Sequence, residues 1–471
     1  MKVDFKKLDR AFNPRVMAVI GDKKDSNYMW LRAQKAFKGK LYSVQIDPAE
    51  IEGIKAMAIE NYTSLMDIPE PVDYAIVAVP RAAALRVLAD LIKKDVGAAF
   101  FFTAGFSETG TQEGIELEKK MTEMASAASF HIVGPNCMGI FSPKAGVKQN
   151  AEQSDTVGPV GFISQSGNHA VNFIQEAHIQ GVEVNKVASY GNGIVLDSAD
   201  YLAYFANDPE IKIIGMYVEG VKNGRRFLDV LRDAASRKPV VVWKGGRSDE
   251  GVRAISSHTG SLAISQSVWN SAMRQFHAVQ VPGQEELIDT LKALLYLPPV
   301  KGDRVAAVGG SGGGSVAVAD TFAEAGLKLP PFSQASYDEF ASFWVNIGGG
   351  YKNPVDTYNA NRREMKRILD ILARDANTDN IVALFAAGHA GPGGRGPSEG
   401  QLSPFADIKQ RTDKPVMAII TGSSSAQSQE VALELMGKLQ TTGIPAFLGM
   451  ERGARALRNA VEYYRMKEGT A

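Results

Sequence analysis

The sequence predicts an α/β protein built from doubly wound parallel sheets, and three observations support this prediction. The chain has 471 residues, which is enough for about three domains of ordinary size. Its apolar runs are short, rich in β-branched residues and bounded by Gly, Pro or Asp, as in strands that are buried on both faces of a sheet. These runs alternate with helical patterns in three successive series, which is typical of doubly wound folds.

The first series contains five predicted strands. They are RVMAVIG ending at Gly21, KLYSVQI ending at Ile46, YAIVAV ending at Val79, AAFFFT ending at Thr103 and HIVGP ending at Pro135. A helix is predicted over residues 81–95, where Leu85, Leu88, Leu91 and Ile92 form one apolar stripe at helical spacing.

The strand pattern then restarts twice. The second and third series are VGFIS to Ser164, VNKVASY to Tyr190, IKIIGMYVEG to Gly220 and PVVVWKGG to Gly246, followed by RVAAVGG to Gly310, NIVALFAAG to Gly388, PVMAIITG to Gly422 and IPAFLG to Gly449. A polar segment, AGVKQNAEQSDTVG, and a Pro-containing break, LPPVKGD, separate the series, and an amphipathic helix over about 451–466 follows the last strand. We therefore predict domains over residues 1–148, 149–298 and 299–471.

The charges balance, with 52 Lys and Arg against 52 Asp and Glu. This balance argues against nucleic acid as a partner, because domains that bind it carry a clustered basic excess. The one cysteine, Cys137, cannot form an intramolecular disulfide, so we expect a reducing compartment. The sequence has no apolar leader and no run of about 18 apolar residues. We expect a cytoplasmic protein that does not span a membrane.

Two Gly/Ser-rich turns open the second and third series in the same way. The segments are VGFISQSGNHAVNFI and VAAVGGSGGGSVAVAD, and each reads as a strand, a turn and a helix. This geometry brings free backbone N–H groups and the positive end of a helix to one point, where an anion binds well. Glycines in either turn would also serve a simple tight connection, but two such turns at equivalent places favour anion sites.

His258 is the candidate nucleophile. It lies in RAISSHTGSLA, which we interpret as an exposed, hydroxyl-rich loop before a helix. A histidine nucleophile needs an acceptor on its second ring nitrogen. Glu219, at the carboxyl end of a predicted strand, is the candidate acceptor, because sites in open α/β sheets lie at such ends. A capping loop with an incidental histidine and a solvated carboxylate are the simpler alternatives.

Several familiar motifs are absent from the sequence. It contains no G-x-x-x-x-G-K-[ST] loop and no kinase set, so a nucleotide site would lie largely on another polypeptide. It also lacks a Gly-x-Ser-x-Gly elbow, a His-Glu-x-x-His helix and an EF-hand loop. Hydrolase and metalloenzyme functions therefore lack support, and no metal site is predicted.

Several ordered motifs from about Val16 to about Leu457 resemble the α-type chain of the NDP-forming acyl-CoA synthetases, which include succinyl-CoA synthetase and the ADP-forming acetyl-CoA synthetases. The most specific is SSHTGSLA, at 256–263. The others are VGPNCMGI (133–140), GFISQSGNHA (161–170), YVEGVKNGRRF (217–227), NPVD (353–356) and GIPAFLGMERGARAL (443–457).

The resemblance implies a Rossmann-like CoA-binding domain followed by two flavodoxin-like domains. It implies the reversible conversion of acyl-CoA, ADP and phosphate into a small carboxylic acid, CoA and ATP, through an acyl phosphate and a phosphohistidine. The nucleotide and its magnesium would bind an ATP-grasp domain on a β-type partner, so a hetero-oligomer is expected. The acid and the choice between ADP and GDP do not follow from this sequence.

Carried over residue by residue, the resemblance makes His258 the phosphoryl carrier and Glu219 the carboxylate that holds it. The implied phosphate-binding residues are Ser166, Gly167, Asn168, Gly312, Gly313 and Gly314. The implied CoA-binding residues are Gly21, Lys23, Lys24, Val79, Pro80, Thr103, Ala104 and Gly105. The acyl group would lie near Asn136, Cys137, Gly191 and Asn192, where Cys137 is better explained as a small packing residue than as a reactive thiol.

The turn after the first strand departs from the family pattern. Relatives carry small residues there, whereas this chain has Asp22, Lys23 and Lys24. Asp22 could repel CoA phosphates and the two lysines could offset it. Asp47 after the second strand is where an NAD-binding domain places an acid, but the glycine fingerprint of such domains is missing. We therefore expect this domain to bind CoA, with contacts to the CoA phosphates that differ from those in relatives.

Two other functions fit parts of the pattern. A nucleotide-independent acyl or carbamoyl transferase would keep the acyl-phosphate chemistry and turn over with CoA or phosphate alone. A noncatalytic CoA-sensing subunit would bind CoA without a phosphohistidine, and the altered turn at Asp22 is its main support. The intact SSHTGSLA segment and Glu219 favour the ligase.

Overall fold

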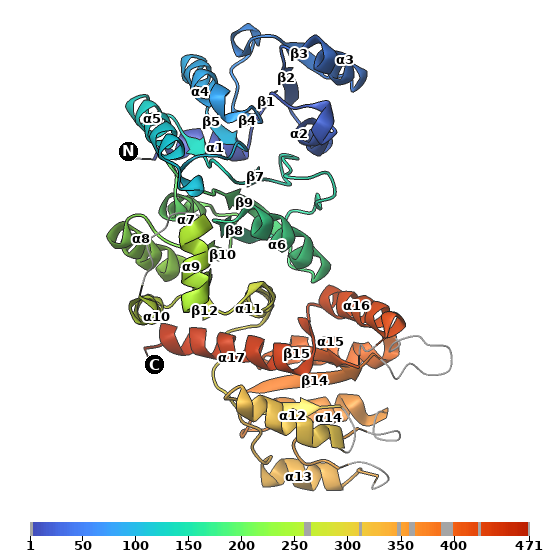
Figure 1. Ribbon diagram of the computed structural model, residues 1–471. Coiled ribbons are helices and arrows are strands. Elements are labelled where there is room, and N and C mark those ends of the chain that lie inside the picture. The colour runs from blue at the N-terminus through green and yellow to red at the C-terminus, as the bar shows by residue number, and fades with distance from the viewer. Residues whose placement is uncertain are drawn as a thin grey trace. The chain divides into compact units, whose positions relative to one another are not determined.

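The computed structural model describes residues 3–258, 265–309, 313–345, 350–357, 363–387, 399–422 and 425–469, with the backbone alone at 256–258, 313 and 399. The chain forms two compact units (Figure 1). The first comprises residues 1–178 and 182–284, and the second comprises 179–181 and 285–471.

The first sheet of the first unit has six parallel strands in the order β3-β2-β1-β4-β5-β6. Its strands are β1 (Val16–Ile20), β2 (Lys40–Val44), β3 (Glu60–Tyr62), β4 (Tyr74–Val77), β5 (Ala98–Phe101) and β6 (Ile132–Val133). This is the strand order of a Rossmann-like sheet. The five predicted strands are confirmed, whereas β3 was missed because the three residues ENY carry no apolar signal.

The helices of this domain cover the sheet with apolar faces. They are α1 (Phe5–Phe12), α2 (Met29–Ala33), α3 (Pro48–Ala56), α4 (Ala84–Lys93) and α5 (Gln112–Ala127), with 3-10 turns η1 (Lys24–Ser26), η2 (Gln34–Ala36), η3 (Leu65–Asp67), η4 (Arg81–Ala83) and η5 (Ser107–Thr109). In α4, Leu88 and Leu91 are fully buried, as predicted, whereas Leu85 and Ile92 are half-buried.

The second sheet has the order β12-β11-β10-β8-β9-β7 and is parallel except for β7, which pairs antiparallel with β9. Its strands are β7 (Gly139–Phe141), β8 (Val160–Ser164), β9 (Val184–Ser189), β10 (Ile213–Val218), β11 (Val240–Lys244) and β12 (Val279–Val281), and its helices are α6 (Gly167–Ile179), α7 (Ser198–Asn207), α8 (Gly224–Arg237), α9 (Asp249–His258) and α10 (Gln266–Gln275). Residues 139–141, which the predicted limit at 148 assigns to the first domain, therefore belong to the second sheet.

The second unit contains a four-stranded parallel sheet in the order β13-β14-β15-β16. Its strands are β13 (Val305–Val308), β14 (Asn380–Ala386), β15 (Val416–Thr421) and β16 (Ala446–Leu448), and its helices are α11 (Gln284–Tyr296), α12 (Gly313–Glu324), α13 (Gln334–Ala341), α14 (Met365–Arg374), α15 (Glu399–Arg411), α16 (Ala426–Thr441) and α17 (Met450–Lys467). Helix α17 confirms the amphipathic helix predicted over about 451–466 and packs along β15 and β16 beside α12 (Figure 1).

The second unit begins at Glu285, before the predicted limit between residues 298 and 299. The reason lies in the polar contacts of α11. The buried Asp289 carboxylate receives two hydrogen bonds from Arg452, at 2.7 and 2.9 Å, and the buried Lys292 ammonium donates to the Ala446 carbonyl at 2.9 Å. The domain limits themselves stay a prediction. None of the helices in the described parts of the chain is long and apolar enough to cross a membrane.

Candidate functional site

A cleft of about 550 Å³ lies in the first unit, at the carboxyl ends of strands from both of its sheets. Four kinds of segment line it: the loops after β4 and β5, the 136–138 segment that precedes β7, the turn between β8 and α6, and the loop after β9. The lining residues are Val79, Pro80, Arg81, Phe102, Thr103, Ala104, Asn136, Cys137, Met138, Gln165, Ser166, Gly167, Asn168 and Gly191.

The cleft brings together members of three predicted groups. They are the CoA residues Val79, Pro80, Thr103 and Ala104, the acyl residues Asn136, Cys137 and Gly191, and the phosphate residues Ser166, Gly167 and Asn168. Of the predicted residues that the structure describes with their side chains, Gly21, Lys23, Lys24, Gly105, Asn192, Glu219 and Gly314 do not line it.

Four lining residues were not predicted: Arg81, Phe102, Met138 and Gln165. Arg81 directly follows AVP, the strand end that resembles the family, so its place in the sequence could have identified it as a lining residue. Its guanidinium donates to the Gly105 carbonyl at 2.7 Å and pairs with Glu113 at 2.9 Å, so it braces the loop after β5. Gln165 lies inside the family-like motif GFISQSGNHA, which was the available signal, and its side-chain oxygen accepts from the Glu219 and Gly220 N–H groups that follow β10.

The turn after β8 presents the start of α6 to the cleft. The Ser164 hydroxyl donates to the Ser166 carbonyl at 2.7 Å and accepts from the Ser166 N–H at 3.2 Å, which fixes the turn. The first N–H groups of a helix have no acceptor within it and carry its positive end. At Gly167, an added Cβ would lie 2.9 Å from the Met138 Cγ, so glycine allows this close approach. The turn therefore has the geometry of an anion site.

The Asn136 backbone joins the loops from the two sheets. Its φ is 57°, in the left-handed region that Asn tolerates, and its N–H donates to the Thr103 carbonyl at 3.1 Å. At Gly191, an added Cβ would lie 2.2 Å from the Asn136 carbonyl oxygen, so only glycine fits there. Burial raises the pKa of the neighbouring Cys137 thiol to about 12, which keeps it neutral and fits the packing role.

Glu219 follows β10 and is buried, with 6% of its surface exposed. This rules out the solvated carboxylate of the simpler alternative. The Tyr217 hydroxyl donates to its Oε1 at 3.1 Å, and its backbone N–H donates to the Gln165 side-chain oxygen at 2.9 Å. Its second oxygen, Oε2, has no hydrogen-bond partner among the described residues. A buried carboxylate oxygen without a donor is costly, so the site has the chemistry to accept one.

Lys244 on β11 supports the Glu219 backbone. Its ammonium is 3% exposed and donates to the Glu219 carbonyl at 2.7 Å. Burial lowers the pKa of Lys244, and the Glu219 carboxylate partly opposes this shift. Beside them, the His169 ring packs against Tyr217 and Trp243, with ring centres 4.5 Å apart in both cases.

His258 is the last residue of α9, so the prediction that it lies in a loop before a helix is wrong for its backbone. Asp249 and Glu250 in the first turn favour this helix through its dipole. The helix also packs against the turn that precedes it, since Ile255 lies against Gly246, where an added Cβ would be 2.4 Å from the Ile255 Cδ1. The His258 side chain, residues 259–264 and Gly312 lie outside the described residues.

Of the second glycine turn, the structure describes the residues that open α12. Gly313 is the first residue of this helix and Gly314 is exposed, and outside α12 the described residues place no atom within 4 Å of the position that a Cβ would take.

The turn after β1 corrects the expectation for Asp22. Its carboxylate is turned inward, with 2% of the residue exposed, and accepts from the Lys23 N–H at 3.0 Å, the Ser26 hydroxyl at 3.1 Å and the Leu31 N–H at 2.9 Å. Burial raises its pKa, against these hydrogen bonds. The Asp22 carboxylate therefore points into the protein, which removes the main support for a CoA-sensing subunit, while Lys23 and Lys24 are exposed.

Two other predicted features of this domain are explained by its backbone. Gly21 has a φ of +83°, and an added Cβ would lie 2.6 Å from the Val79 Cγ1, so glycine lets β1 and β4 approach at this edge. The Asp47 carboxylate caps α3 by accepting from the Ala49 N–H at 2.9 Å. This capping role accounts for the acid without a bound ribose.

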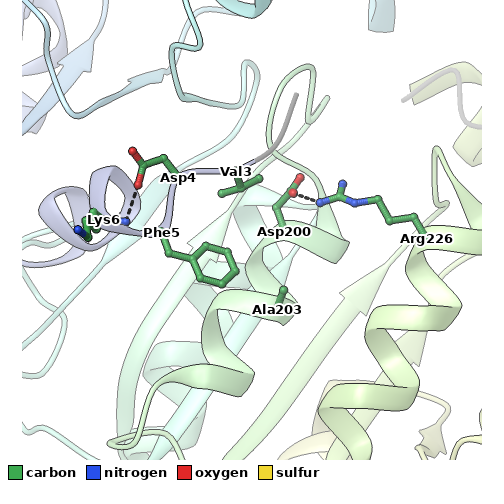
Figure 2. Close-up of a pocket in the computed structure, with 7 residues that line it drawn as sticks. All are labelled: Val3, Asp4, Phe5, Lys6, Asp200, Ala203 and Arg226. Atoms are coloured by element: carbon green, nitrogen blue, oxygen red, sulfur yellow. Dashed lines mark hydrogen bonds and ion pairs between the residues drawn. The ribbon is translucent and has the colours of Figure 1, made fainter.

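A second cavity of about 550 Å³ lies elsewhere in the first unit, between the start of the chain and helices α7 and α8 (Figure 2). Its charged groups largely satisfy one another. The buried Asp200 pairs with Arg226, and the Asp4 carboxylate accepts from the Lys6 N–H at 2.9 Å (Figure 2). None of the predicted site residues lines it.

Residues 15–143 match the CoA binding domain family, and residues 157–294 match the succinyl-CoA ligase like flavodoxin domain family. The α subunit of the ADP-forming acetate–CoA ligase II of Pyrococcus furiosus is 34% identical over 447 residues, which cover 93% of this chain and 94% of that protein. This chain belongs to the family of these α subunits.

The prediction of an α-type chain of an ADP-forming acid–CoA ligase is thereby confirmed, together with the Rossmann-like and flavodoxin-like fold class. A solved structure of acetyl-coenzyme A synthetase 1 from Ca. Korarchaeum cryptofilum, in complex with phosphate and ADP, is also similar to this chain. It has a TM-score of 0.82 and 28% identity, and the match covers 98% of each chain.

A third relative is longer than this chain. The ADP-forming acetate–CoA ligase I of Archaeoglobus fulgidus is 33% identical, and the match covers 96% of this chain but 63% of that ligase. About a third of that family member therefore has no counterpart in this sequence.

Proposed function

We propose that this ligase family member interconverts acyl-CoA, ADP and phosphate with a small carboxylic acid, CoA and ATP, as the α subunit of a hetero-oligomer. The single observation that supports this best is the cleft, which is lined by the predicted CoA, acyl and phosphate residues together. Acetate is the first acid to test, since the relatives are named acetate–CoA ligases.

The first step takes place in the cleft. Phosphate bound at the Ser166–Asn168 turn attacks the thioester carbonyl, the carbon–sulfur bond breaks, and CoA leaves as the thiol while an acyl phosphate forms. The N–H groups at the start of α6 bind the phosphate, and this turn lies in the same lining as Asn136. The neutral Cys137 thiol takes no part.

The second step transfers the phosphoryl group to His258. One ring nitrogen attacks the phosphorus, the bond to the acyl oxygen breaks, and the carboxylate leaves. The second ring nitrogen donates to Glu219, which stabilises the positive charge of the phosphorylated ring. The buried, unpartnered Oε2 of Glu219 supports this role, since it lacks a donor among the described residues.

The last step requires a partner. We propose that ADP and its magnesium ion bind an ATP-grasp β subunit, which receives the phosphoryl group from His258. The larger Archaeoglobus relative and the subunit name of the Pyrococcus relative support a missing second part. The buried single cysteine fits a reducing compartment, and we assign the enzyme to the cytoplasm on that ground.

The experiment is intact mass spectrometry of the chain after incubation with Mg-ATP and an ATP-grasp partner. We expect one acid-labile phosphate that depends on the partner and is lost in His258→Ala, while CoA binding measured by calorimetry is kept. Glu219→Gln should reduce phosphoenzyme formation by about 10- to 100-fold, because a hydrogen bond to a charged group is lost. A phosphate retained in His258→Ala would contradict the mechanism.

A further inference from the structure

Two half-buried carboxylates meet at one amide beside the cleft. The Asn192 side-chain nitrogen donates to the Glu108 Oε2 at 2.6 Å and to the Glu118 Oε2 at 2.9 Å. Asn192 itself is 7% exposed. Glu108 lies in η5 and Glu118 in α5, whereas Asn192 follows β9 of the other sheet. The three side chains therefore join the two sheets of the first unit, and we call them the carboxamide latch.

Glu108 holds the loop that lines the CoA side of the cleft. Its Oε1 accepts from the Gly105 N–H at 2.6 Å, and both of its oxygens accept from the Phe106 N–H at 3.1 Å. This loop follows directly on the lining residues Phe102–Ala104. The Glu108 carboxylate therefore fixes the conformation of the backbone that the predicted CoA site requires.

Glu118 holds the next turn of the same loop. Its Oε2 accepts from the Ser107 N–H at 3.3 Å and from the Ser107 hydroxyl at 2.7 Å, as well as from Asn192. Helix α9, which ends at the predicted phosphoryl carrier His258, also contacts η5. The latch therefore lies where the loop after β5, which we call the CoA loop, meets α9, the helix that ends at His258.

On the acyl side of the cleft, Asn192 is hydrogen-bonded to the segment that contains Asn136. The Asn192 backbone N–H donates to the Pro135 carbonyl at 3.0 Å, and the Asn192 side-chain oxygen accepts from the Asn136 amide at 3.4 Å. Asn136 lines the cleft, whereas Asn192 does not. Every polar atom of the Asn192 side chain is therefore used to connect a lining residue to the two carboxylates.

The chemistry of the latch requires a neutral donor at position 192. An amide donates to both carboxylates and accepts from Asn136 with its oxygen, whereas an aspartate would add a third negative charge and lose the donor. Lys222 is a nearby cation: although its side chain is exposed, desolvation by the surrounding chain lowers its pKa, and the Glu118 and Asp197 carboxylates oppose this shift.

We propose that Asn192 is a positioning residue. It fixes the position of the CoA loop relative to Asn136, so that the thioester of bound acyl-CoA lies against the acyl and phosphate side of the cleft. This inference rests on the proposed function for its substrates. It assigns Asn192 a role through its neighbours, in place of the direct substrate contact predicted from the sequence.

The test compares Asn192→Asp with the wild type, using acetate and CoA as probes. Phosphoenzyme formation from Mg-ATP and the partner should stay within about twofold, since it needs no CoA. Discharge of the isolated phosphoenzyme by acetate plus CoA should slow at least tenfold, and the KM for CoA should rise more than kcat falls, because loss of a hydrogen-bonded charged contact costs about this much. CoA affinity by calorimetry should fall by about tenfold.

A charge swap and a matched control separate positioning from general damage. In Asn192→Asp combined with Glu118→Gln, the donor and the acid exchange places and the net charge is unchanged, so discharge should return to within about threefold of the wild type. Asn223→Asp adds the same charge at the N-cap of α8, where Asp is an equally good cap, and should change nothing.

Two results would overturn the proposal. One is unchanged CoA affinity and unchanged discharge in Asn192→Asp. The other is a double variant that discharges as slowly as Asn192→Asp at equal thermal stability. If the wild type forms no phosphoenzyme while Asn192→Asp still weakens CoA binding tenfold, the proposed function fails and the latch stands.

Discussion

The turns after β1 and β8 each connect a central parallel strand to a helix, one in each sheet of the first unit. They differ in whether the backbone N–H groups of the turn donate to a side chain of the protein. After β1, the buried Asp22 carboxylate accepts from backbone N–H groups of its own turn and of α2, at Lys23 and Leu31. After β8, a serine turn leads into the 13-residue α6, whose first residues, Gly167 and Asn168, line the cleft.

Under the proposed function, this difference means that one topology would recognise anions in two ways. At the β8 turn, backbone N–H groups and the helix dipole can bind a compact phosphate. At the β1 turn, backbone N–H groups already donate to the Asp22 carboxylate. The positive charge that attracts a phosphate must therefore come from the exposed side chains of Lys23 and Lys24. Substitutions at the two turns should therefore differ in the size of their effect on ligand binding and in how strongly salt reduces that effect.

The largest effect is expected at the β8 turn. Asn168→Asp places a carboxylate at the start of α6, so the KM for phosphate should rise by about tenfold through charge repulsion. The free energy of unfolding should rise by about 0.3–1 kcal/mol, because the same charge suits the helix dipole. Phosphate kinetics with the partner subunit and chemical denaturation measure the two quantities.

Asn168→Ser is the neutral control and should leave the KM for phosphate within about twofold, since serine also suits a helix start. A variant Asn168→Asp that binds phosphate like the wild type would remove the β8 turn from the site.

A smaller effect is expected at the β1 turn. Replacing both Lys23 and Lys24 by Gln should weaken CoA binding by about fivefold, and the loss should shrink at high salt, as for exposed charges. Calorimetry at two salt concentrations measures this. The matched control changes two exposed lysines of α5, Lys119 and Lys120, to Gln and should leave CoA affinity unchanged.

Asp22→Asn tests the other half of this comparison. Because the carboxylate is buried and faces its own turn, the variant should not gain CoA affinity. It should instead lose about 1–3 kcal/mol of unfolding free energy, because the amide cannot accept all of the hydrogen bonds. A tighter complex with CoA would show that Asp22 repels the ligand after all.

The smallest effect concerns the pH dependence of the β8 region. Burial lowers the pKa of His169, against the Glu219 and Glu176 carboxylates. A lowered pKa in the folded state means that this group contributes full stability above the unfolded value of about 6.5 and loses it as the pH falls. The free energy of unfolding should therefore decrease less between pH 7 and pH 5 in His169→Phe than in the wild type.

Phenylalanine keeps the ring packing of His169 against Tyr217 and Trp243, so the two proteins should have similar stability at pH 7.5. Parallel pH profiles in wild type and variant would show that His169 does not titrate differently in the folded chain.

The sequence predicted the strands with strong apolar runs and missed those without them. Strands β3, β7 and β12 were missed, although β16, which also has three residues, was predicted, so shortness alone does not explain the misses. The hydroxyl-rich segment around His258 was interpreted as a loop, whereas the backbone is helical up to His258, because its acidic first turn and Ile255 stabilise α9.

By itself, the sequence determined the alternation of strands and helices, the two glycine turns and the family, because apolar periodicity and motifs are local properties. Only the tertiary structure decided which polar groups meet. Asn192 donates to Glu108 and Glu118 from 84 and 74 residues away along the chain, and Asp22 turns inward to Leu31. Such hydrogen bonds depend on how strands from two sheets end beside one another, and no local pattern records that geometry.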